Sequence, residues 1–247
     1  MRGGMHMKEW MRQRFVLSGC MLIGILLLGI VTAEEVLIPA LSVPNEGSYT
    51  LVLDAGHGGM DGGAVAADGT AEQDINLAIV LRCRDLASFL GMPAVLTRTD
   101  TQSLDYDSEN TIRQNKVADI HARERITNEQ NNPVFLSVHL NKFSDSSYSG
   151  AQTFWSKNNT GGQRLAECIQ ASLTEGLHPA RERRAKPAEN SIYLMKTLTC
   201  PAVIVECGFL SNSEETEKLK QSDYQTRIAV SILSGYCGWV TEAEGTA

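Results

Sequence analysis

The sequence contains no C-x-x-C pair, no internal repeat and no excess of basic residues. The missing repeat argues against a solenoid or another repeat array. Residues 1–33 carry four Lys or Arg and one Glu, so the rest of the chain has 18 basic against 28 acidic residues, a net charge of −10. Because nucleic-acid binding requires a basic surface, this charge excludes nucleic acid as a partner.

The cysteines are few and scattered along the chain. Five of the six follow residue 33, and because five is odd, at least one of them stays unpaired. Cys83, Cys168 and Cys237 fall within helical patterns, and Cys207 adjoins an apolar run. We therefore expect these four to pack as small hydrophobic residues.

An apolar run without a charge, Phe15 to Ala33, follows a basic N-terminus. The run is long enough to span a membrane, but the small residues before Glu34 also suit a signal peptidase, so an anchor and a cleaved signal peptide both stay open. The basic flank places the rest of the chain outside the cytoplasmic membrane. We expect the following division: residues 1–33 a membrane anchor or signal peptide, 34–48 a linker, 49–241 one domain and the last residues a short tail.

Apolar patterns after residue 48 alternate between strands and helices. Predicted strands are 49–54, 94–98, 134–138, 151–155, 192–195 and 202–205. Apolar residues recur every three or four positions in the helical segments, which run to Gly91, from Thr111 to about Gln130, from 165 to 177 and from 228 to 240. Ser211 and Glu214 predict a capping box. Strands that alternate with helices predict an α/β sandwich.

Two histidines directly follow predicted strands. His57 stands among glycines in Gly56–Gly59, and His139 precedes Asn141, while Glu72 lies just ahead of a helical pattern. Sites in α/β proteins form where strands end. Catalytic zinc typically takes three protein ligands from His nitrogens and carboxylate oxygens and leaves a fourth position for water. We predict that His57, Glu72 and His139 bind Zn²⁺, the alternative being packed or hydrogen-bonded structural residues.

Glu206 ends the apolar run Ala202–Val205, which should be buried on both faces. A buried carboxylate is costly unless it is paired. Beside a metal, Glu206 would take a proton from water and pass it to a leaving amine, as a general base and then a general acid. The alternative is a structural salt bridge to Arg98 or Arg123.

With these residues the sequence resembles the zinc-dependent N-acetylmuramoyl-L-alanine amidases, over about residues 49–240. The resemblance rests on four segments in order: Leu53–Gly59, Glu72, Ser137–Asn141 and Val205–Asn212. It implies a single-domain, three-layer sandwich with a central, mostly parallel mixed sheet. It also implies Zn²⁺ on His57, Glu72 and His139, a catalytic Glu206, and Arg123 and Asn128 as support for the strand before His139.

The implied reaction is hydrolysis of the amide between the lactyl group of N-acetylmuramic acid and L-Ala of the peptidoglycan stem peptide. Segments 62–65, 149–152 and 191–195 resemble the germination-specific, spore-cortex members of spore-forming bacteria. This subgroup implies action in the cell-wall space, before muramic-δ-lactam forms, with a possible activator protein. A zinc carboxypeptidase on stem peptides and an inactive peptidoglycan-binding protein remain alternatives.

A basic cluster stands out in this acidic domain. It consists of Arg181, Arg183, Arg184 and Lys186. Stem peptides carry free carboxylates, so we hypothesise that this loop helps to hold the stem. The alternative is an ordinary solvated surface loop.

Overall fold

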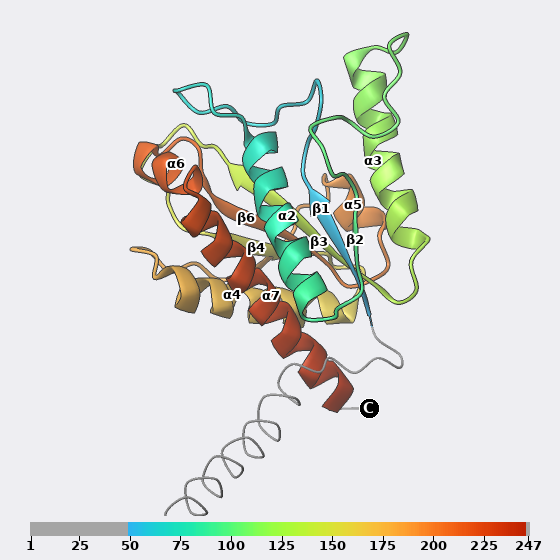
Figure 1. Ribbon diagram of the computed structural model, residues 1–247, viewed down its shortest axis with the longest axis vertical. Helices are drawn as coiled ribbons and strands as arrows, with labels where there is room; N and C mark the ends of the chain where they lie inside the picture. The colour runs from blue at the N-terminus through green and yellow to red at the C-terminus, as the bar shows by residue number, and fades with distance from the viewer. Residues whose placement is uncertain (1–48, 246–247) are drawn as a thin grey trace, which may run out of the picture. The chain divides into compact units, whose positions relative to one another are not determined.

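Six strands form one sheet in the computed structural model, which describes residues 49–245 (Figure 1). The strand order is β2-β1-β3-β6-β4-β5. Neighbouring strands are parallel except β4 and β6, which run antiparallel. The strands are β1 (Thr50–Ala55), β2 (Ala94–Leu96), β3 (Pro133–Asn141), β4 (Gln152–Trp155), β5 (Lys186–Pro187) and β6 (Ala202–Phe209). The expected mixed, mostly parallel sheet is confirmed.

Helices cover both faces of the sheet. They are α2 (Glu72–Phe89), α3 (Ile112–Asn128), α4 (Thr160–Leu177), α5 (Tyr193–Thr197), α6 (Ser213–Leu219) and α7 (Ser222–Gly245). Helix α7 packs on α2 and α4 on one side of the sheet, whereas α3 and α5 pack together on the other (Figure 1). The α/β sandwich predicted from the alternating pattern is therefore confirmed.

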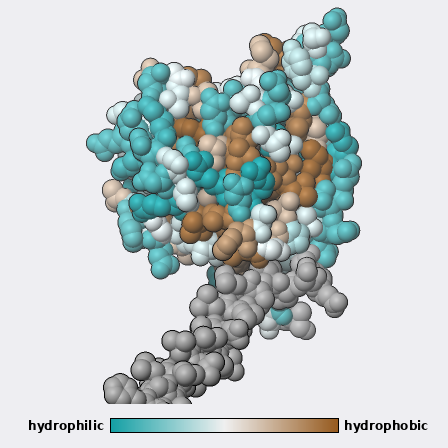
Figure 2. All heavy atoms as spheres, viewed as in Figure 1, coloured by the Kyte–Doolittle hydropathy of each residue, from teal (hydrophilic) through white to brown (hydrophobic). Residues whose placement is uncertain are grey.

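Alternating strand residues supply the buried core. Leu51 and Leu53 of β1 and Leu136 of β3 are fully buried. Phe135 belongs to the opposite face, where it packs in one apolar cluster with Met195 of α5 and Ile204 of β6. In the view of Figure 2, hydrophilic residues dominate the rim of the domain and hydrophobic residues gather toward its middle.

Three predictions about local structure outside the sheet are wrong. Residues 193–197 form the short helix α5 and not a strand, because an apolar run of four fits one helical turn as well as a buried strand. The N-cap of α6 is Asn212, whose side chain accepts from the Glu215 amide, while Ser211 Oγ accepts from Phe143. Helix α7 continues through residues 241–245, where we expected a tail.

The N-terminal segments fall outside the described part of the chain. Residues 1–33, expected as an anchor or signal peptide, and the linker 34–48 lie there entirely. Within residues 49–245, no helix combines the length and apolar character needed to span a bilayer.

Candidate metal centre

His57 follows β1 in a sharp turn. Its φ of 64° lies in the left-handed region, which a β-carbon disfavours. Gly58 and Asp61 exchange backbone hydrogen bonds across the turn. Arg123 Nη2 donates to the His57 carbonyl at 2.7 Å. These contacts hold the strained backbone of the turn in place, and the His57 ring lies against Asp61 and Glu72.

Glu72 is the first residue of α2 and has only 3% of its surface exposed. Its Oε2 accepts from the Ala64 amide at 2.8 Å, and its Oε1 accepts from the Leu140 amide at 3.0 Å. The loop before α2 and strand β3 therefore fix both carboxylate oxygens.

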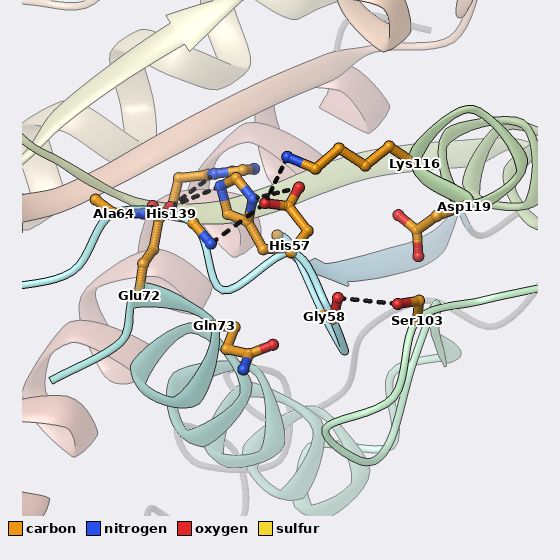
Figure 3. A network of polar contacts seen from close by, with 12 residues as sticks. His57, Gly58, Ala64, Glu72, Gln73, Ser103, Lys116, Asp119 and His139 are labelled. Atoms are coloured by element: carbon orange, nitrogen blue, oxygen red, sulfur yellow. Dashed lines mark hydrogen bonds and ion pairs between the residues drawn. The ribbon is translucent and has the colours of Figure 1, made fainter. Parts of the chain in front are cut away.

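The three predicted ligands meet next to the ends of β1 and β3. His57 Nε2 and His139 Nδ1 lie 3.2 and 3.0 Å from Glu72 Oε1. One donor atom from each residue lies within 4.8 Å of the other two, and the side chains converge in Figure 3. Two imidazole nitrogens and a carboxylate oxygen are the donor set of catalytic zinc sites.

At two positions beside the cluster, the absence of a side chain on glycine makes room for the predicted ligands. A β-carbon on Gly56 would lie 2.2 Å from His139 Cε1, and one on Gly63 would lie 2.6 Å from Glu72 Oε2. A larger residue at either position would push a predicted ligand out of place. The packing and the chemistry of the donors thus fit a divalent metal ion.

The electrostatics of the cluster favour a cation. Burial lowers the pKa of His57, but hydrogen bonds with Asp61 and Glu72 outweigh it and raise the pKa to about 9. Burial raises the pKa of Glu72, but His139 and His57 together hold it well below its ordinary value. The buried carboxylate therefore stabilises positive charge at this point, whether a proton on His57 or a metal ion.

Asp61 is a site residue that sequence reasoning missed. Its Oδ2 lies 3.1 Å from His57 Nδ1, and its Oδ1 lies 2.9 Å from Lys116 Nζ. Figure 3 shows Lys116 extending from α3 toward His57. A carboxylate that accepts a hydrogen bond from one ring nitrogen of a histidine orients the other nitrogen toward a metal. The only sequence signal was an acidic residue four positions after His57, within the glycine turn.

Glu206 lies inside β6, paired with His139 of β3, and not at a strand end as expected. The strands continue past the predicted ends at residues 138 and 205. Glu206 Oε2 is buried without a hydrogen-bond partner among residues 49–245. Burial, opposed by His139 and reinforced by Glu72, raises the pKa of Glu206 to about 7. The carboxyl group can therefore exchange a proton near neutral pH.

The alternative salt bridges of Glu206 are absent from the described residues, because both arginines have other partners. Arg98 donates to the carbonyls of Ala55 and Gly56. Arg123 pairs with buried Asp54 and donates to the Ala55 carbonyl at 2.9 Å. Burial alone would raise the pKa of Asp54, but Arg123 and two hydroxyl hydrogen bonds hold it below its ordinary value.

Arg123 therefore supports the end of β1, which carries His57. The resemblance had implied a supporting role at the strand before His139, whose Ser137 hydroxyl also bonds to Asp54. Asn128, the other residue named for that role, is the last residue of α3.

A cleft opens beside the cluster, between α3 and α5. It has a volume of about 180 Å³ and is lined by both predicted ligand histidines. Its lining includes the exposed apolar side chains of Met60, Ile112 and Ile192. The predicted metal site therefore opens into this cleft, which can hold part of a substrate.

The basic cluster contains one half-buried residue and three exposed ones. Arg181, Arg184 and Lys186 are exposed. Arg183 is half-buried, donates from Nε to the Ser149 carbonyl at 2.8 Å, and has its Cζ 4.7 Å from the centre of the Phe209 ring. The alternative of a uniformly solvated loop is wrong for Arg183.

The cysteines match their expected role in part. Cys83 and Cys207 are buried, whereas Cys168, Cys200 and Cys237 are partly exposed. All five are free thiols within the described part of the chain.

Comparison with known proteins identifies relatives of this chain. The family model described as N-acetylmuramoyl-L-alanine amidase matches residues 51–237. The germination-specific N-acetylmuramoyl-L-alanine amidase of Bacillus subtilis is 33% identical over 201 residues, which cover 81% of this chain and 83% of that protein.

Solved structures give the same result. The chain is similar to the CwlD amidase from Clostridioides difficile, solved in complex with the GerS lipoprotein, with a TM-score of 0.74 and 41% identity over 78% of this chain and 99% of that one. It is also similar to the catalytic domain of CwlV, an N-acetylmuramoyl-L-alanine amidase from Bacillus (Paenibacillus) polymyxa, with a TM-score of 0.67 and 26% identity over 78% and 98% of the two chains.

Proposed function

This chain belongs to the N-acetylmuramoyl-L-alanine amidase family, and we propose that it cleaves its amide with a zinc ion held by His57, Glu72 and His139 and with Glu206 as the general base. The convergence of these donors within 4.8 Å carries the proposal. The bond cleaved joins the lactyl group of N-acetylmuramic acid to L-Ala of the stem peptide in peptidoglycan.

A zinc ion in this position would polarise the amide carbonyl and make water more acidic. The chain's own side chains transfer the proton and orient the predicted ligands. Glu206, partly desolvated and next to His139, takes the proton of the attacking water. It then returns that proton to the nitrogen of L-Ala as the C–N bond breaks, so one group serves as base and acid. Asp61 keeps His57 Nδ1 hydrogen-bonded, which leaves His57 Nε2, on the side of Glu72, as the nitrogen that would hold a metal.

The biological setting is the second part of the proposal. We place the domain outside the cytoplasmic membrane, acting on the spore-cortex wall before muramic-δ-lactam forms, and likeness to the germination-specific amidase of Bacillus subtilis supports this role. An activator protein is a further part, supported by the complex of the Clostridioides difficile CwlD amidase with a lipoprotein. Membrane attachment through residues 1–33 stays a prediction.

Mass spectrometry of digested peptidoglycan tests the reaction. The complete chain, solubilised in mild detergent and supplied with zinc, should release intact stem peptides with a new N-terminal L-Ala. The Glu206→Gln variant should release none. A chelator should stop the wild-type reaction, and added zinc should restore it.

Other products would change the conclusion. Release of terminal amino acids alone would indicate a carboxypeptidase. Binding to peptidoglycan without any product, from wild type with zinc and a lipoprotein partner present, would indicate an inactive wall-binding protein.

A further inference from the structure

Two charged side chains in the described residues have a buried polar atom without a hydrogen-bond partner. One is Glu206, through Oε2, and the other is Arg183, through Nη2. Buried charged groups are normally satisfied, so each exception calls for an explanation. Catalysis explains Glu206. No part of the proposed reaction uses Arg183.

Arg183 is connected to Glu206 across one face of the sheet. Residues directly opposite each other in neighbouring strands share a face. His139 of β3 is opposite Glu206 of β6, and Glu206 is opposite Gln152 of β4. Gln152 Oε1 accepts from Arg183 Nη1 at 3.2 Å. The row therefore runs from the metal centre through the general base to the Arg183 guanidinium.

The surroundings of Arg183 leave its charge without a direct counter-ion. Its Cζ lies 4.7 Å from the Phe209 ring centre and 5.5 Å from that of Tyr148. Glu215 is the nearby carboxylate, but its two oxygens accept from the amides of Gly150 and Phe209. Burial and the neighbouring Arg181 lower the pKa of Arg183, so an additional carboxylate would be stabilising.

The row runs over a length comparable to the first few residues of an extended stem peptide. From His139 to Gln152 it spans two strand spacings, about 10 Å in all, and the hydrogen bond to Arg183 lies beyond them. An extended peptide advances about 3.4 Å per residue, so the second residue of a stem lies about 7 Å beyond the scissile amide. That residue carries a free α-carboxylate in stems where its side-chain carboxyl group forms the next peptide bond.

We propose that Arg183 is a specificity residue that binds the α-carboxylate of the second stem residue, which directs the peptide toward β4 and leaves the cleft between α3 and α5 for the glycan. This assignment rests on the proposed amidase function. Tyr148, on the loop between β3 and β4, covers the guanidinium and shifts when the carboxylate enters. Of the four residues in the basic cluster, only Arg183 is partly buried; the other three are exposed.

A matched pair of ligands tests the proposal. Both are N-acetylmuramoyl-L-alanyl-γ-D-glutamyl-L-lysine, with the glutamyl α-carboxyl group free in one and converted to a carboxamide in the other. Affinities are measured by calorimetry with the complete, zinc-loaded chain carrying Glu206→Gln, so that nothing is hydrolysed. Arg183→Gln and Arg183→Lys are then added to this background. Arg184→Gln, which removes the same charge from the exposed neighbouring residue, is the control.

We expect the parent to bind the carboxylate about tenfold more tightly than the carboxamide, as for a hydrogen bond to a charged group. Arg183→Gln should reduce this ratio to about one with little change for the carboxamide, Arg183→Lys should keep part of it, and Arg184→Gln should preserve it. A ratio near one in the parent, a ratio unchanged by Arg183→Gln, or an equal loss of both affinities would overturn the proposal. Hydrolysis of both ligands by the wild-type protein, which keeps Glu206, is measured separately. Absence of hydrolysis would contradict the proposed amidase function, whereas the binding ratios test the role of Arg183.

Discussion

His57 Nδ1 and Asp61 Oδ2 lie 3.1 Å apart, although both residues belong to the same short turn. The positive φ of His57 folds the chain back so that a residue four positions later reaches the ring. Lys116 holds the other Asp61 oxygen at 2.9 Å. The orientation of the predicted ligand His57 thus depends on the Asp61 carboxylate, which is not one of the three predicted ligands.

Asp61→Asn should weaken zinc binding about 10- to 100-fold, as expected for loss of a carboxylate behind a ligating histidine. Competition with a chromophoric chelator measures the affinity. Asp68→Asn is the matched control, because Asp68 is an exposed aspartate of the same loop region that pairs with Lys220. Equal affinities for wild type and Asp61→Asn would remove Asp61 from the site.

Gly56→Ala should reduce zinc affinity while the protein stays folded, because the new methyl group would displace the His139 ring. Gly62→Ala is the control, since a β-carbon there meets nothing within 4 Å. Zinc content after dialysis and circular dichroism of each variant give the two readouts. Full zinc occupancy in Gly56→Ala would contradict the predicted role of His139.

Glu206→Gln should stabilise the metal-free protein at alkaline pH. The folded-state pKa of Glu206 is raised from 4.5 to about 7. The stability associated with its protonated form is therefore complete below about pH 4.5 and is lost as the pH rises through 7. Above pH 8 the variant should exceed wild type by up to about 3 kcal/mol in free energy of unfolding.

Urea unfolding in the presence of a chelator, at pH 5 and pH 8, measures this difference. Glu214→Gln, at an exposed glutamate of α6, provides the control for a simple loss of charge. A difference between variant and wild type that does not change with pH would show that Glu206 is not desolvated in solution.

Arg123→Ala should lower the free energy of unfolding by about 3–5 kcal/mol, because it leaves the buried Asp54 carboxylate unpaired. Arg125→Ala, which breaks the exposed pair with Asp105, should cost less than about 1 kcal/mol. Chemical denaturation of both variants measures the two values. Similar small losses would indicate that water compensates for Arg123.

Part of the site is encoded in local sequence patterns. Apolar runs located β1, β3 and β6, and polar residues just past those runs identified His57, His139 and Glu206. Glu72 was found through the family resemblance and its place before a helix. These residues are separated widely along the chain, yet each lies next to an apolar or helical pattern that can be recognised in the sequence.

The remaining features depend on long-range packing. Lys116 reaches Asp61 from α3, and Arg183 reaches Gln152 from a loop 31 residues away in sequence. No local pattern encodes such pairs. The run 192–195 was misassigned because its helical state is stabilised by tertiary contacts, including Tyr193 with Glu124 of α3.

The most direct test of the account is a zinc titration of the complete, metal-free chain and its Glu206→Gln variant, with bound metal and release of stem peptide measured on the same samples. The account predicts one zinc per chain in both proteins, with release that rises in proportion to bound zinc in wild type and stays absent in Glu206→Gln. Undiminished release by Glu206→Gln, or release by wild type that does not depend on bound zinc, would contradict it.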